Sequence, residues 1–206
     1  MAITQKKLTE NKKTEQLIDK NILIMILPIV GYGHSILRKK TTDITKDYPN
    51  IKELVDNMFE TMYRASGVGL AAPQINLSIS VLVIDTDVFK DTYPEGEGWR
   101  VAMINPEKLE EYGNSWAFEE GCLSVPGIRE NVMRPSNVKV KYLDTDFVEH
   151  IEELDGIRAR VFQHEYDHLQ GKVFVEKLSN IRRAFLKRKL KDIEENRVRT
   201  DYKMLK

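Results

Sequence analysis

The chain has 206 residues, and 41% of them are hydrophobic, which is enough for one globular domain with a buried core. Lysine and arginine together number 32, as do aspartate and glutamate, so no overall charge would attract nucleic acid or an anionic membrane. The single cysteine, Cys122, excludes an internal disulfide and is typical of a reducing compartment, so we expect a cytoplasmic protein.

The first 24 residues are charged and show no apolar stripe, and a second methionine, Met25, follows them. We therefore expect residues 1–24 to be an extension outside the core, or the product of a misplaced start. The apolar run at residues 22–30 contains Pro28 and is too short to span a bilayer. The residues after it make a poor signal-peptide cleavage site, so neither a membrane segment nor a leader is predicted.

An amphipathic helix is predicted to begin near Asp47, with Pro49 in its first turn, and to end at Gly67. Its apolar positions recur every three or four residues, as they do on the core-facing side of a helix. This stripe consists of Ile51, Leu54, Val55, Met58, Phe59 and Met62.

Three strands are predicted next, at residues 80–85, 101–105 and 137–144, because their apolar residues are continuous or alternate with period two. Residues 86–100 are rich in turn formers and predict a loop. A helix is predicted at residues 157–170. A last amphipathic helix is expected to turn Ile181, Phe185, Leu186, Leu190 and Ile193 inward. Without β-α-β alternation, this order predicts an α+β fold.

The stretch "GVGLAAPQ" (67–74) mimics the G-x-G-x-x-A fingerprint of dinucleotide binding. That fingerprint follows a strand and opens a helix, whereas here a helix comes first and Pro73 interrupts any new one, so no dinucleotide is expected. Glycines suit a backbone that closely approaches another group, and the Gln74 amide can serve as half of an oxyanion hole. A plain glycine turn is the alternative.

The stretch "QHEYDHLQG" (163–171) places His164 and His168 four residues apart on a predicted helix. Side chains at this spacing lie on one helical face and can reach one metal ion, while Glu165 can reach a water molecule on the open side of that ion. This is the spacing of a metal-activated water with a carboxylate base. Two solvated histidines on an ordinary helix are the alternative, because the motif also occurs by chance.

A third metal ligand is expected upstream of this helix. The extended protease form of the motif requires a histidine where the chain has Phe174, and the downstream acids Glu194 and Glu195 lie on the polar side of a lysine-rich helix. Cys122, in "EGCLS" (120–124), would complete a set of one thiolate and two imidazoles with a fourth position open, as in catalytic sites. Such a set favours Fe2+, Zn2+, Co2+ or Ni2+. Alternatively, Cys122 is a small buried apolar residue.

Together, "GVGLAAPQ", "EGCLS" and "QHEYDHLQG" closely resemble, in order and separation, the three signature motifs of peptide deformylases. The resemblance covers residues 25–178, and residues 179–206 correspond to a basic C-terminal helix and tail. It implies an α+β fold with small antiparallel sheets around a central helix that bears the H-E-x-x-H motif. It also implies a metallohydrolase that removes the N-formyl group from the initiator methionine of nascent polypeptides and releases formate.

The resemblance implies a role for each matching position. Cys122, His164 and His168 would bind the metal, which is generally Fe2+ in the family, with Zn2+, Ni2+ or Co2+ able to substitute. Glu165 would be the general base and acid. The developing oxyanion would be held by Gln74 and the backbone N–H of Leu123. Residues implied to contact the substrate are Gly69 and Arg129 along the peptide and Val68, Phe118 and Val161 around the methionine.

The C-terminal residues are strongly basic. From Lys177 to Lys206, eleven Lys or Arg residues accompany four Asp or Glu residues, a net charge of +7. A solvated helix surface explains this pattern, and so does contact with ribosomal RNA, as in relatives with a basic C-terminal helix.

Two other classes of function share parts of the pattern. A metalloprotease would need a third ligand after the helix, which the chain lacks. A structural metal site in a binding protein would need a fourth protein ligand, and the only other histidines are His34 and His150. Both have polar neighbours and are expected at the surface.

Overall fold

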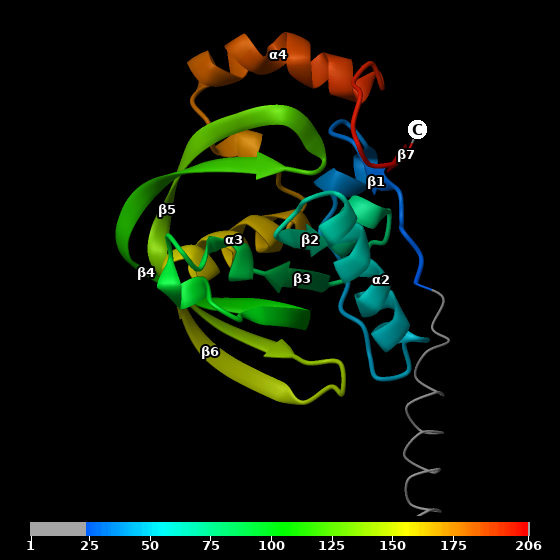
Figure 1. Ribbon diagram of the computed structural model, residues 1–206, viewed down its shortest axis with the longest axis vertical. Coiled ribbons are helices and arrows are strands. Elements are labelled where there is room, and N and C mark those ends of the chain that lie inside the picture. The colour runs from blue at the N-terminus through cyan, green and yellow to red at the C-terminus, as the bar shows by residue number, and fades with distance from the viewer. Residues whose placement is uncertain (1–23, 206) are drawn as a thin grey trace, which may run out of the picture.

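The protein is described by a computed structural model that covers residues 24–205. Its elements surround one central helix, α3 (Gly156–Leu169), as Figure 1 shows. The helix predicted at residues 157–170 is therefore confirmed. The expected N-terminal extension, residues 1–24, falls almost wholly outside the described residues.

The main sheet is antiparallel, and its five strands lie in the order β2-β3-β4-β5-β6. A second, two-stranded sheet pairs β1 with β7 in parallel, so the end of the chain lies beside the beginning of the domain (Figure 1). This mixed architecture agrees with the predicted α+β class. The strands are β1 (Ile29–Val30), β2 (Gly69–Ala71), β3 (Val81–Asp85), β4 (Arg100–Cys122), β5 (Val125–Leu143), β6 (Glu149–Asp155) and β7 (Met204–Leu205).

Strands β4 and β5 extend far beyond the segments predicted from sequence, because the apparent strand breakers lie at irregularities in their ladder. Pro106 lies within the register shift between Ile104 and Glu107, and Gly113 lies within another shift. A bulge tolerates both the missing N–H of proline and the φ of +80° at Gly113. Bulges also bend strands, and the β4–β5 hairpin curves strongly around α3 in Figure 1.

Helix α2 (Ile51–Arg64) follows the predicted stripe, and its bounds differ slightly from the prediction. Asn50 is the N-cap, so Pro49 precedes the helix instead of lying in its first turn. The left-handed residue after the helix is Ser66, with φ of 57°, and not Gly67. Gly67 instead faces the side chain of Leu123. A Cβ there would lie 2.8 Å from a methyl carbon of Leu123.

Helix α3 is buried on most of its surface, so it carries polar side chains into the interior. Its apolar residues, including Ile157 and Phe162, pack against the main sheet. The N–H of Ile157 donates a 3.0 Å hydrogen bond to Glu95, which lies in the loop at residues 86–100 and caps the helix. The buried polar residues of α3 are Arg160, Gln163, His164, Glu165, Asp167 and His168.

Helix α4 (Asn180–Glu194) buries a narrower stripe than predicted. Leu186, Leu190 and Ile193 are buried, whereas Ile181 and Phe185 are 71% and 74% exposed. The prediction that the last two point inward is wrong. At about 100° per residue, Phe185 lies a quarter turn away from Leu186 and outside the stripe.

No helix within residues 24–205 has both the length and the apolar character needed to cross a bilayer.

Replacing Phe162 with alanine should lower the free energy of unfolding by about 3 to 5 kcal/mol, because a wholly buried ring leaves a cavity beside α3. Urea unfolding followed by circular dichroism measures the change. Phe185→Ala is the matched control and should shift stability by less than about 0.5 kcal/mol, because this ring is exposed. A similar loss in both variants would contradict the placement of Phe185.

Candidate active site

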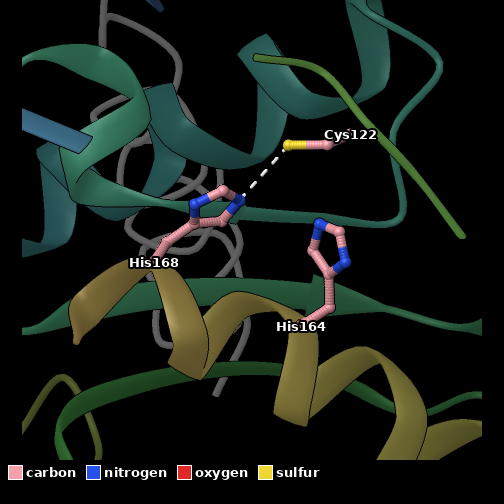
Figure 2. A group of neighbouring side chains, drawn as sticks. All are labelled: Cys122, His164 and His168. Atoms are coloured by element: carbon pink, nitrogen blue, oxygen red, sulfur yellow. Dashed lines mark hydrogen bonds between the residues drawn. The ribbon is translucent and has the colours of Figure 1, made fainter. Parts of the chain in front are cut away.

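Three predicted side chains converge between α3 and the end of β4. His164 and His168 project from α3, and Cys122 faces them from the last residue of β4 (Figure 2). One potential ligand atom from each lies within 4.8 Å of the others. The sulfur of Cys122 is 3.3 Å from Nε2 of His168. Within residues 24–205, no other three Cys, His, Asp or Glu side chains form such a group.

The chemistry of this donor set fits a divalent metal ion. One thiolate and two imidazoles leave a fourth position open in a tetrahedral site, which is the pattern of catalytic zinc and related ions. Both histidines are buried, and burial lowers the pKa of His168 well below its usual value. A neutral imidazole is the form that binds metal. The role of these residues as ligands stays a prediction that the geometry supports.

A buried ionic network lies behind His164 and is centred on Glu120. Its carboxylate accepts hydrogen bonds from His164 Nδ1 at 2.9 Å, from Arg134 at 2.7 and 2.9 Å, and from Arg160 at 2.9 Å. Arg134 also donates a 2.6 Å hydrogen bond to Asp167 of α3. Every ion in this network therefore has a partner of opposite charge, as burial requires.

Glu120 determines which nitrogen of His164 faces Cys122. Burial by itself would raise the pKa of Glu120, but hydrogen bonds from Arg134 and His164 hold it well below its usual range, so the carboxylate is ionised. An ionised carboxylate only accepts hydrogen bonds, and Nδ1 of His164 must then carry a proton. Burial by itself would lower the pKa of His164, but hydrogen bonds to Cys122 and Glu120 raise it well above its usual value. A metal ion bound at the other nitrogen, Nε2, would therefore displace a proton from it.

The strand pattern of the sequence contains a signal for Glu120. Residues two apart in a strand point to the same face, and Phe118, Glu120 and Cys122 have this spacing at the end of β4. No comparable signal identifies Arg134 or Arg160, because arginine is usually exposed and its burial depends on partners from distant segments.

Glu165 lies beside the three converging side chains with one unused oxygen. It is 4% exposed, and its Oε2 has no hydrogen-bond partner within residues 24–205. Burial raises the pKa of Glu165 to about 7, although the nearby His164 opposes this shift. A Cβ at Gly69 would lie 2.7 Å from Cγ of Glu165, so only glycine lets strand β2 pass this carboxylate.

Gln74 and Leu123 also reach the site. Oε1 of Gln74 accepts a 2.8 Å hydrogen bond from the N–H of Ala71, which turns its Nε2 toward Cys122 Sγ at 3.6 Å and Ser124 Oγ at 3.4 Å. Leu123 follows Cys122 in the turn between β4 and β5. Two N–H donors, one from a side chain and one from the backbone, are therefore available at this end of the site.

A cleft of about 740 Å³ opens onto these residues. All five residues predicted to contact substrate lie in its wall: Val68, Gly69, Phe118, Arg129 and Val161. Two further segments contribute to the wall of the cleft. Val88 and Phe89 come from the loop at residues 86–100, and residues 199–202 come from the C-terminal segment after α4.

The glycine stretch does not form a dinucleotide site, and the other two histidines lie away from Cys122. Residues 67–74 follow helix α2 and form strand β2 with a short 3-10 helix (Ala72–Ile75), which differs from the strand-to-helix context of a dinucleotide site. His34 is exposed, and half-buried His150 is paired with Asp144 at 2.8 Å. Neither belongs to the group around Cys122.

Comparisons with known proteins agree on one family. The family model described as polypeptide deformylase matches residues 26–184. Peptide deformylases from Flavobacterium psychrophilum and Flavobacterium johnsoniae are 46% and 49% identical to this chain over 187 residues, covering 87% of it and 96% and 95% of theirs. The crystal structure of peptide deformylase from Ehrlichia chaffeensis superposes with a TM-score of 0.75 at 37% identity, covering 84% of this chain and 99% of that one.

Glu120→Gln should weaken the affinity for a divalent metal by about 10- to 100-fold, because the carboxylate that orients His164 becomes a neutral amide. Competition with a chromophoric chelator measures the affinity, on protein whose circular dichroism matches the parent. Glu110→Gln is the matched control, since Glu110 is exposed on the same strand. If both variants bind metal as tightly as the parent, Glu120 does not tune the site.

Proposed function

The chain belongs to the peptide deformylase family, enzymes that remove N-formyl groups from nascent peptides, and we propose how its own residues carry out that hydrolysis. The observation that carries the proposal is the convergence of Cys122, His164 and His168 at a cleft whose wall includes Cys122, His164 and Glu165. We assign the first three residues as ligands of one divalent ion, natively Fe2+, with Zn2+, Ni2+ or Co2+ able to substitute. Such an ion supplies Lewis acidity and lowers the pKa of the water that it binds.

Glu165 is the proposed general base and acid. Its carboxylate takes a proton from the attacking water, whose oxygen forms a bond to the formyl carbon. When the bond between that carbon and the peptide nitrogen breaks, Glu165 returns the proton to the amine, and formate leaves. A pKa of about 7 supports both roles, because proton transfer in either direction is then nearly balanced at neutral pH.

The proposed oxyanion donors are the Gln74 amide and the backbone N–H of Leu123. The hydrogen bond from Ala71 to Oε1 fixes the Gln74 side chain before substrate arrives. Donors that are already oriented stabilise developing charge without any cost of reorganisation during the reaction. Leu123 is adjacent to Cys122, so its N–H lies next to the proposed metal position.

The proposed methionine pocket consists of Val68, Phe118 and Val161, which pack on the apolar cluster around α3 and line the cleft. Gly69 and Arg129 are proposed to lie along the peptide beyond the methionine. An apolar pocket of this kind distinguishes unbranched side chains of similar length only weakly. Selectivity for formylated peptides therefore comes from the reacting group more than from the side chain.

We also infer that α4 contacts the ribosome. The helix carries Arg182, Arg183, Lys187, Arg188, Lys189 and Lys191 within four turns. Arg182 is partly neutralised by Glu130, with which it forms a bidentate ion pair. Lys191 pairs with Glu195 at 3.7 Å. The other four bases have no acidic partner within residues 24–205 and remain available to phosphate groups of ribosomal RNA. Contact with the ribosome would place the enzyme in the cytoplasm, next to the nascent chains on which it acts.

Glu165→Gln should lower the rate of formate release from formyl-Met-Ala-Ser by about 10²- to 10⁴-fold while the metal stays bound. Both proteins are purified without oxygen, and plasma mass spectrometry identifies and counts the bound metal. Glu110→Gln, an exposed site on β4, serves as the matched control. Parent protein with one metal per chain and no formate release would refute the proposed function, and an active Glu165→Gln would refute the role of the base.

Reversing two charges on α4, by Arg183→Glu with Lys187→Glu, should weaken cosedimentation with ribosomes about tenfold or more at low salt and flatten its salt dependence. The control is Lys39→Glu with Lys46→Glu, which reverses two exposed charges elsewhere. Equal weakening in the two double variants would indicate a general charge effect and contradict a contact through α4.

A further inference from the structure

The segment after α4 returns to the active-site cleft. The chain turns at Asn196, which has φ of 54°, and residues 199–202 then form part of the cleft wall. Strand β7 pairs with β1, and the N–H of Ile29 donates a 2.9 Å hydrogen bond to the carbonyl of Lys203. Figure 1 shows β7 beside β1 at the edge of the domain. The segment is thus fixed directly after residue 202.

Tyr202 links this segment to the proposed catalytic residues. Its hydroxyl donates a 2.7 Å hydrogen bond to the carbonyl oxygen of Leu123. Its half-buried ring packs, together with the side chain of Leu123, against the apolar cluster that contains Met58, Met62 and Leu70. The contact joins residues that are 79 positions apart in the sequence.

The turn at Leu123 and Ser124 is otherwise held mainly through Ser124. The carbonyl of Ser124 accepts a 2.7 Å hydrogen bond from the N–H of Tyr32, and its hydroxyl accepts one from Gln74. The N–H of Leu123 makes no hydrogen bond to another residue within 24–205. The Tyr202 hydroxyl is therefore the polar contact that fixes the backbone of Leu123 itself.

We propose that Tyr202 is a positioning residue, which holds the backbone of Leu123 so that its free N–H meets the developing oxyanion. The C-terminal segment thereby completes the active site. The hydroxyl holds the peptide plane between Leu123 and Ser124, whereas the N–H of Leu123 belongs to the preceding plane, and the two planes meet at the Cα of Leu123. Without the hydroxyl, both planes can rotate about the bonds to this Cα, and the N–H of Leu123 loses its fixed orientation. This inference rests on the proposed function, because the oxyanion arises only during deformylation.

The test compares Tyr202→Phe with Tyr48→Phe. Tyr48 is half-buried and packs against the same apolar cluster, and its hydroxyl makes no hydrogen bond to a residue within 24–205. With formyl-Met-Ala-Ser, Tyr202→Phe should lower kcat about tenfold and leave KM within about twofold, because one oxyanion donor is misplaced but substrate contacts are kept. Tyr48→Phe should change neither constant.

Hydrogen exchange supplies a second readout that does not depend on activity. The backbone amides of residues 119–125 should exchange faster in Tyr202→Phe than in the parent, whereas those of α2 should not change. Unchanged kcat, unchanged exchange, or loss of bound metal in Tyr202→Phe would each overturn the proposal. Absence of formate release in the parent would instead refute the proposed function, and the exchange result would still decide whether Tyr202 holds the turn.

Discussion

The buried ion pair between Glu120 and Arg134 is the interaction on which the site depends. Charges are costly to bury, and this pair persists because each hydrogen-bonding group finds a partner: His164 and Arg160 for the carboxylate, Asp167 for the guanidinium. Glu120 lies on β4, Arg134 lies on β5, and their three partners lie on α3. The network therefore fixes how the strand that carries Cys122 is placed relative to the helix that carries both histidines.

Phe174 shows why this chain differs from the proteases that share its H-E-x-x-H motif. Where those proteins place a third histidine, Phe174 is buried, and its ring lies 5.8 Å from that of His164. An apolar ring there confines His164 without competing for a metal.

The loop at residues 86–100 also supports the active site. Phe89 and Tyr93 pack on Phe118, and Glu95 caps α3, so this loop supports both the cleft wall and the start of the central helix.

The parts of the fold and site that the sequence predicted correctly depend on local geometry. Spacing along a helix places His164 and His168 on one face, whatever the rest of the chain does. Strand β6 was missed because its sequence is mostly charged, and Leu154 is its one buried residue. The inward face of α4 was overestimated, because periodicity does not reveal how wide a stripe the neighbouring segments cover. Arg134 and Tyr202 could not be assigned, since each acts through a contact with a distant segment.

The parallel pairing of β1 with β7 has a consequence for how each molecule is made. Its two partners are the first and the last strands of the described chain. Synthesis proceeds from the N-terminus, so β1 is made early and has no partner until β7 has left the ribosome. A wall of the cleft comes from that same late segment. The cleft of a new copy therefore stays incomplete until the segment after α4 has been synthesised and β7 has paired with β1.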